Sequence, residues 1–313
     1  MARTVVGGER IVDGITPIAA YARLAASCGG PSFLLESSPG AQQTARYSII
    51  GLGAAGEVRA ADGIACASWD GRTERYAARD VLAACRDLLH RLAPASGAGG
   101  AWNGFLGAYG AAAFEFAGHL ERLPNLPHSR DRVPDLHLIV PRTTIVFDHF
   151  AHSAAVLDAG GRDEDVDDTF ALLESASIEA PEPPSRSVVT RDADSAPDGA
   201  RSLPYRDAVG RAKESIFAGD VFQLVLSQRW SVEADIAPFD AYRRLRAINP
   251  SPYMFLIETD ELALIGASPE LLLSVTDGLA VTDPIAGTRR RGVTDDEDLA
   301  LEEELRADPK ERA

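Results

Sequence analysis

The sequence predicts an α+β fold built mainly from antiparallel strands, and three observations favour this class. The 313 residues, 45% hydrophobic and 25% charged, suffice for one large domain or two ordinary ones. Amphipathic segments and short apolar strands mix without a regular βαβ alternation. In the last third of the chain, successive strands are joined by short turns, as in hairpins.

The first half of the chain supplies a helix flanked by strands. Residues 46–53 and 56–62 predict two short strands, and residues 136–150 and 153–159 predict a hairpin. Residues 79–93 predict a helix, because their apolar side chains recur at helical spacing. The face expected to pack inward consists of Val81, Ala84, Cys85, Leu88, Leu89 and Leu92.

Residues 178–202 divide the chain. They are rich in Pro, Ser, Asp and Ala and have almost no hydrophobic period, which indicates a linker or long loop. We therefore expect an N-terminal region at residues 1–177 and a second region at residues 203–313.

The second region begins with a predicted helix at residues 203–220, with Ser202 suited to its N-cap and Gly219 to its C-terminal stop. Residues 221–230 predict a strand whose alternation places Gln223 on the face opposite the core, toward a cavity. The elements expected after it are a helix at 239–248 and strands at 253–258, 262–267 and 271–283.

Charge and cysteine content exclude several classes of protein. The chain carries 31 Lys and Arg against 47 Asp and Glu, a net charge of −16 that repels nucleic acid and anionic lipid. Cys28, Cys66 and Cys85 lack the spacing of a metal site and fit free thiols in a reducing compartment. The start of the chain lacks the apolar stretch of a secretory signal, and no window predicts a membrane span. We expect a cytoplasmic protein without nucleic-acid or membrane partners.

Two short segments carry candidate chemistry. In "DPIAGTRRRG", Gly287 lets the backbone approach a ligand and Thr288 offers a hydroxyl, so the turn can hold a carboxylate. The arginines that follow are better explained as a solvated run that balances the acidic segment from Asp295, which we expect to open a helix. In "GASPELLLS", Glu270 precedes an apolar strand and is either a partly desolvated general acid or a glutamate in water.

Several strings in fixed order go beyond composition. They are "LLESS", "RYSIIG", "GDVFQLVLSQRW", "NPSPYMFLIE", "IGASPELLLSV", "DPIAGTRRRG" and "ADPKERA". Together they resemble component I of anthranilate synthase, in the family of chorismate-utilising enzymes. The resemblance implies two stacked, mainly antiparallel sheets flanked by helices, with residues 203–313 as the first part of the chorismate-binding catalytic domain.

The resemblance also implies roles for single residues. Glu270 matches the acid that assists departure of the 4-hydroxyl of chorismate, and Gly287 and Thr288 match its binding loop. Gln223 and Ala286 stand where relatives with other products carry lysine, so both favour ammonia as nucleophile. The alternative is the related synthase of 4-amino-4-deoxychorismate.

A tryptophan-binding regulatory site between the two regions is implied as well. Its residues are Leu35, Glu36, Ser37, Asn249, Pro252, Tyr253 and Met254. Read locally, "NPSPY" is only a Pro-rich turn between a helix and a strand.

The family further implies Mg²⁺ and a glutamine amidotransferase subunit that delivers ammonia. Glu311 of "KERA" lies near the metal in relatives, whereas the direct ligands are expected after residue 313. We therefore expect this chain to be the N-terminal part of such an enzyme, inactive by itself. A non-catalytic, tryptophan-binding module is the alternative from another class of protein.

Overall fold

The structure is a computed structural model that describes residues 5–37, 46–92, 100–123, 133–175, 177, 187–191, 205–227, 230–285 and 287–312. Its strands are β1 (Val6–Ile11), β2 (Ser32–Glu36), β3 (Tyr47–Ala61), β4 (Ile64–Trp69), β5 (Arg72–Ala77), β6 (Tyr109–Ala112), β7 (Leu136–Asp148), β8 (Ser153–Asp158), β9 (Ser187–Arg191), β10 (Trp230–Ala234), β11 (Tyr253–Glu258), β12 (Ala263–Ser268), β13 (Leu271–Thr276) and β14 (Leu279–Asp283). Its α-helices are α1 (Pro17–Ala25), α2 (Val81–Leu92), α3 (Ala117–Leu120), α4 (Asp163–Glu174), α5 (Tyr205–Ala218), α6 (Pro238–Ile248), α7 (Asp295–Ala307) and α8 (Pro309–Arg312).

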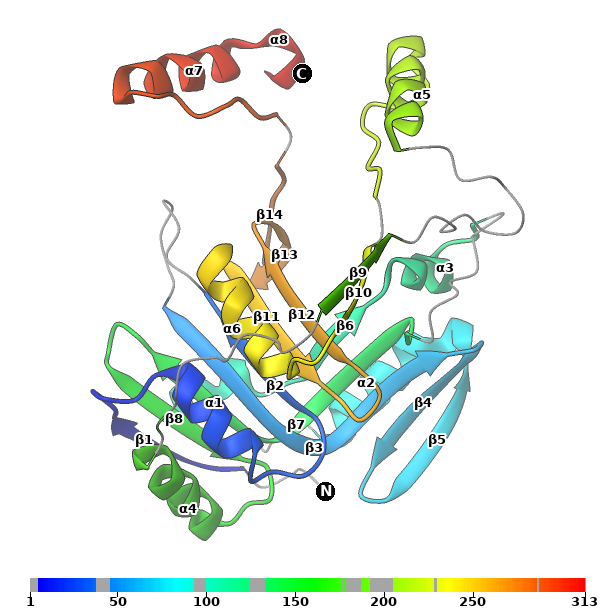
Figure 1. The fold of residues 1–313 in the computed structure, drawn as a ribbon. Coiled ribbons are helices and arrows are strands. Elements are labelled where there is room, and N and C mark those ends of the chain that lie inside the picture. The colour runs from blue at the N-terminus through cyan, green and yellow to red at the C-terminus, as the bar shows by residue number, and fades with distance from the viewer. Residues whose placement is uncertain are drawn as a thin grey trace.

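The described strands form one ten-stranded sheet and two separate two-stranded sheets, β9–β10 and the hairpin β13–β14 (Figure 1). The order in the large sheet is β1-β8-β7-β3-β2-β11-β12, with β4 and β5 continuing from β3 and with β6 beside β7. Its strand pairs are antiparallel, and helices pack against the sheet. The predicted α+β class is therefore confirmed.

Strand β3 joins what the sequence predicted as two strands. At Gly53, with φ of +60°, and at a register shift between Ala54 and Gly56, the chain bends without leaving the sheet. The first part of β3 pairs with β2 and the second part with β4, while β7 pairs along both. The described strands on either side of the bend are thus halves of one continuous sheet and not two separate sheets.

Three hydrophobic clusters hold this sheet. The largest packs the sheet against α1, α4 and α6, and it includes Tyr21, Leu34 and Tyr242. The second lies under α2, where Leu88 is buried as predicted while Leu89 remains 40% exposed. The third joins Phe33 of β2 to Ile139 of β7, and the Phe33 ring lies 4.7 Å from that of Tyr109 on β6. This third cluster packs the two halves of the sheet together.

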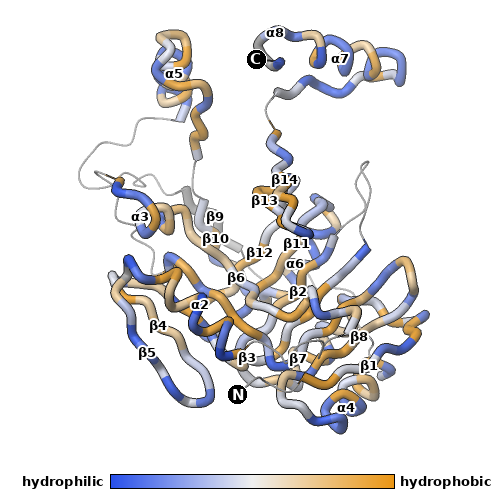
Figure 2. Tube along the Cα trace, turned by 180° about the vertical axis from the view of Figure 1, so that it is seen from behind, coloured by the Kyte–Doolittle hydropathy of each residue, from blue (hydrophilic) through white to orange (hydrophobic). Residues whose placement is uncertain are grey.

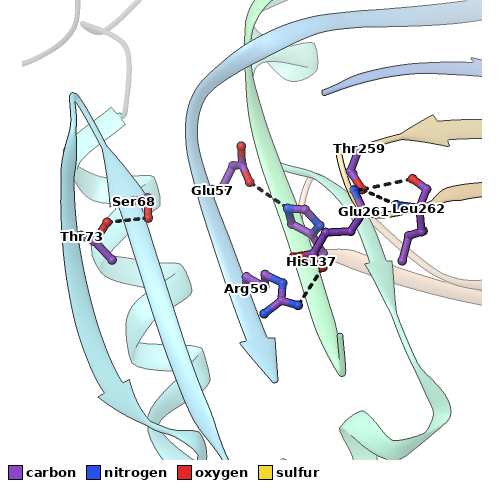
Figure 3. A network of polar contacts seen from close by, with 8 residues as sticks. All are labelled: Glu57, Arg59, Ser68, Thr73, His137, Thr259, Glu261 and Leu262. Carbon is purple, nitrogen blue, oxygen red and sulfur yellow. Dashed lines mark hydrogen bonds and ion pairs between the residues drawn. The ribbon is translucent and has the colours of Figure 1, made fainter. Parts of the chain in front are cut away.

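Polar contacts reinforce the same junction (Figure 3). Arg59 on the second part of β3 donates to Glu261, in the turn between β11 and β12, at 2.8 Å. Beside it, the ring of His137 lies 2.9 Å from Glu57. A strand from the N-terminal region and a turn from the second region are therefore linked directly.

The second region follows the sequence prediction except at residues 221–230. Helix α6 and strands β11 to β14 occur where the pattern predicted them. Residues 221–227 are irregular, Phe222 is fully exposed, and a strand begins only at Trp230. An alternating pattern becomes a strand only if another strand lies beside it, and within the described residues none pairs with 221–227. The partner of β10 is β9, which lies inside the predicted linker.

Helix α5 and the pair α7–α8 stand away from the sheet (Figure 1). Helix α5 begins and ends close to its predicted bounds, but none of its described residues is buried and Phe217 is 90% exposed. The hairpin β13–β14 is also exposed and hydrophobic (Figure 2), with Leu272 at 89% and Leu279 at 68% exposure. None of the described helices combines the length and the apolar character needed to cross a bilayer.

The Gly51→Ala variant tests the packing of the third cluster. A Cβ at position 51 overlaps the ring of Phe33, which is only 1% exposed. We expect overpacking to lower the free energy of unfolding by about 1–3 kcal/mol, measured by urea denaturation. Gly14→Ala, where an added Cβ meets no atom, is the control and should change it by less than about 0.5 kcal/mol. Equal effects of the two substitutions would contradict this packing.

Candidate functional site

Strands β2 and β11 bring together two segments that lie more than 200 residues apart in the chain. Leu35 pairs with Phe255 and Glu36 with Met254 in an antiparallel register. Asn249 ends α6, and Pro252 directly precedes β11. Leu35, Glu36 and Met254 of the predicted set therefore meet where these two strands pair, which we call the β2–β11 seam (residues 32–36 and 254–258).

A buried carboxylate lies at one end of this seam. The side chain of Glu36 is 5% exposed, and its Oε2 accepts a hydrogen bond of 2.6 Å from the Tyr242 hydroxyl. Arg246 Nε lies 3.0 Å from the same oxygen. Burial, and then the negative charge of Glu36, raise the pKa of Tyr242 well above its usual range, so its hydroxyl remains a donor.

The sequence analysis did not identify Tyr242 or Arg246. They are four residues apart on α6, so both project from one face of the helix toward Glu36. A signal was present in "DAYRRLRAI", where a tyrosine and an arginine at this spacing accompany an apolar face. It does not reveal which carboxylate they hold, because Glu36 is 206 residues away from Tyr242.

A second tyrosine–carboxylate contact closes the other end of the seam. The Tyr21 hydroxyl of α1 donates to Glu258 Oε2 at 2.6 Å and lies 2.8 Å from Ser32 Oγ. Burial, followed by the hydrogen bond to Glu258, raises the pKa of Tyr21 above its usual range. Helices α1 and α6 thus each place a buried tyrosine at one end of the seam.

Glu270 lies on an exposed turn before β13. Its Oε1 accepts a hydrogen bond of 3.0 Å from the backbone N–H of Ile285. Of the two interpretations of Glu270, the described chain supports the glutamate in water, because the residue is exposed to solvent. The hydrogen bond nevertheless places Glu270 beside the predicted binding loop. Within that loop Gly287 is half-buried and Thr288 exposed, whereas Ala286 lies outside the described residues.

The three arginines after Thr288 pair with acidic residues of the chain itself. Arg289 contacts Glu304 at 3.0 Å and Asp308 at 2.7 Å. Arg290 pairs with Glu297, and Arg291 with Asp298 at 2.6 Å. The interpretation that this run balances the following acidic segment is confirmed. The expected helix start is also found, because the Thr294 hydroxyl accepts from the Glu297 N–H at the N-terminus of α7.

Gln223 does not join this group. It is exposed in the irregular segment after α5, which stands to one side of the β13–β14 hairpin in both overall views (Figures 1 and 2). The structure therefore brings Glu270 to the Ile285–Thr288 loop but leaves the predicted Gln223 apart.

The described residues do not fit a metal site. Glu311 lies on α8, and its side chain is outside the described part of the structure. Among the side chains that are described, no three carboxylate, histidine or cysteine groups gather as metal ligands. Mg²⁺ requires several oxygen ligands in near-octahedral geometry, which the described side chains do not provide.

Comparison with known proteins identifies related chains. A family described as chorismate binding enzyme matches residues 30–313. Anthranilate synthase component 1 from Mycolicibacterium smegmatis is 37% identical over 325 aligned positions, covering 97% of this chain and 60% of the relative. Its counterpart from Thermus thermophilus is 38% identical, covering 97% of this chain and 64% of the relative.

Solved structures agree on the fold. The crystal structure of anthranilate synthase component I from Streptococcus pneumoniae matches with a TM-score of 0.62 at 26% identity, covering 97% of this chain and 65% of that one. The isochorismate synthase MenF from Escherichia coli matches with a TM-score of 0.51 at 16% identity, over 99% of this chain and 61% of that one. The chain thus spans 60–65% of the length of these relatives.

The Tyr242→Phe variant tests the Glu36 contact. Removing the hydroxyl leaves a buried carboxylate oxygen without its donor, so we expect the free energy of unfolding to fall by about 1–3 kcal/mol in urea denaturation. Tyr205→Phe, at a tyrosine that is 41% exposed, is the matched control and should shift it by less than about 0.5 kcal/mol. Unchanged stability of the Tyr242 variant would mean that the hydrogen bond does not stabilise the seam.

Proposed function

Because the chain belongs to the family of chorismate binding enzymes, we propose that it is the N-terminal part of an anthranilate synthase component I. Full-length relatives with this name resemble 97% of the chain at 37–38% identity, and this similarity is the observation that carries the proposal. The proposed reaction converts chorismate and ammonia to anthranilate, pyruvate and water, as the first committed step of tryptophan biosynthesis. A glutamine amidotransferase subunit supplies the ammonia.

Glu270 is the proposed acid of this reaction. It protonates the 4-hydroxyl of chorismate, which leaves as water while ammonia adds to the ring. The hydrogen bond from the Ile285 N–H supports this role, because it holds the carboxyl beside the loop that contains Gly287 and Thr288. These two residues are proposed to bind a carboxylate of chorismate, through the backbone and the hydroxyl respectively. A general acid works best away from bulk water, so an exposed Glu270 needs a further cover.

Two uncharged residues bear on the choice of product. Gln223 and Ala286 provide no amine, so free ammonia is the proposed nucleophile and anthranilate the proposed product. The alternative activity, synthesis of 4-amino-4-deoxychorismate, is distinguished by its product. Mg²⁺ is the proposed cofactor, by analogy with the family, and is therefore included in the activity assay.

We propose that Glu270 is covered by the C-terminal part that the relatives have and that this chain does not span. The support is the apolar surface left open in the described residues of the second region. Leu272 and Leu273, adjacent on β13, are 89% and 58% exposed, and Val275 on the same strand is 64% exposed. Neighbouring exposed apolar side chains of this kind mark a surface that another part of a protein covers. Phe217 on α5 is 90% exposed as well.

L-Tryptophan is the proposed feedback inhibitor, bound at the β2–β11 seam. The proposed contacts are Leu35, Glu36, Ser37, Asn249, Pro252, Tyr253 and Met254. Support comes from the convergence of the two segments in space and from the buried negative charge of Glu36, which suits the ammonium group of an amino acid. The seam joins both regions of the chain, as coupling between a regulatory and a catalytic site requires.

Anthranilate formation tests the proposed activity. The intact enzyme is this chain extended by the C-terminal part that the relatives have in addition. In the presence of Mg²⁺ it should convert chorismate and ammonia to fluorescent anthranilate. The 313-residue chain alone should not, whereas co-expression with the missing C-terminal part should restore it. Glu270→Gln should lower kcat by about 100-fold or more, because the departing hydroxyl loses its proton donor. Aminodeoxychorismate as the product of the intact enzyme would transfer the protein to the alternative function.

Calorimetric titration with L-tryptophan tests the proposed regulation. The 313-residue chain should bind it, since both segments of the seam are present, and Ser37→Phe should abolish the binding by filling the space near the ligand. In the intact enzyme, the same substitution should raise the tryptophan concentration for half-inhibition while leaving the KM for chorismate nearly unchanged. Equal changes in both would show that the two sites are not separate. Binding without any activity of the intact enzyme would favour the non-catalytic module.

A further inference from the structure

The loop proposed to bind chorismate is held at both ends. Before it, the Ile285 N–H donates to Glu270. After it, Arg289 bonds to Glu304 on α7 and to Asp308, which lies between α7 and α8. Arg289 Nη1 also lies 3.3 Å from the carbonyl oxygen of Thr288. The backbone at Gly287 and Thr288 thus runs between two fixed points.

Arg289 differs from the two arginines that follow it. Its side chain is 27% exposed, compared with 68% for Arg290 and 89% for Arg291. Its partner Asp308 is also mostly buried, at 26% exposure. Hydrogen bonds to Asp308 and then to Glu304 raise the pKa of Arg289, which therefore stays charged. A guanidinium can bond to two carboxylates at once in a fixed geometry, which a single ammonium does less well.

The contacts of Arg289 also determine where α7 lies. The N-terminal end of α7 is tied to the loop through the N–H groups of Gly292 and Val293, which donate to Asp298 and Glu297. Its C-terminal end is tied to the loop through Arg289. Since α7 and α8 stand away from the sheet, these bonds hold the helices against residues 289–293 (Figure 1). Residues 289–293 and α7 are therefore joined at both ends of the helix.

From these contacts we infer that Arg289 is a positioning residue for the chorismate-binding loop. Through Glu304 and Asp308 it holds the backbone at Gly287 and Thr288 in the conformation that receives the substrate, without contacting the substrate. The inference rests on the proposed function, which assigns substrate binding to this loop. Arg291, in contrast, is 89% exposed and pairs with Asp298 at the N-terminal end of α7, away from the contacts of Arg289 with Glu304 and Asp308.

Arg289→Gln with Arg291→Gln as matched control tests the inference in two measurements. In the intact enzyme, Arg289→Gln should lower kcat/KM for chorismate by about 10- to 100-fold, because a misplaced binding loop costs that much. Asp308→Asn should act alike, and the double variant should lose little more than Arg289→Gln alone, since both substitutions remove the Arg289–Asp308 contact. Arg289→Lys should recover part of the loss. Arg291→Gln should stay within about twofold of the wild type.

Amide hydrogen exchange of the 313-residue chain provides the readout that is independent of activity. Arg289→Gln should accelerate exchange across residues 285–289 and at the end of α7, while Arg291→Gln should leave residues 285–289 unchanged. If the wild-type intact enzyme forms no anthranilate, the proposed function fails, and the exchange data alone decide whether Arg289 orders the loop. If the wild type is active and the Arg289 and Arg291 variants behave alike, the inference is wrong.

Discussion

The pairing of β2 with β11 is the interaction on which the rest of the structure depends. It joins the N-terminal region to the second region in one sheet, with Leu34 and Leu256 opposite each other and inaccessible to solvent. Without it, β11 and β12 would not be joined to the large sheet. The largest hydrophobic cluster would then lose Tyr242 of α6 and Met254 of β11. Both proposed sites depend on this pairing. The proposed tryptophan site lies along the seam, and the proposed chorismate-binding loop follows β13 and β14, which continue the chain from β12.

Buried charge makes the seam specific as well as stable. A carboxylate such as Glu36 is costly to bury unless hydrogen bonds and a cation compensate for the lost water. Tyr242 and Arg246 do so in the observed register, and at the other end Tyr21 donates a hydrogen bond to the half-buried Glu258. A shift of β11 along β2 would carry Glu258 away from Ser32 and Tyr21. The register is therefore determined by polar contacts in addition to the hydrophobic pattern.

The C-terminal part of the described chain is organised by a different principle. Helix α7 makes its contacts with residues close in sequence, through arginines and backbone N–H groups of residues 289–293. Such local contacts form without a core, which explains a well-defined helix that has no buried residue. The hydrophobic hairpin β13–β14 has no comparable local partner for its side chains. Its exposed leucines form an apolar surface of the kind that marks an interaction site.

The sequence by itself determined the elements whose signals are local. The spacing of Val81, Ala84 and Leu88 predicted α2, the threonine before an acidic run predicted the start of α7, and the motif order predicted the family. Tertiary structure decided the rest. Residues 221–227 alternate like a strand but lack a described neighbour, whereas β3 continues through a glycine because β7 pairs with it on both sides of the bend. The partners of Glu36 and Glu258 depend on chain segments more than 200 residues away. Helix periodicity and capping act within a few residues, but strand pairing and the compensation of buried charge depend on which distant segment the fold brings alongside.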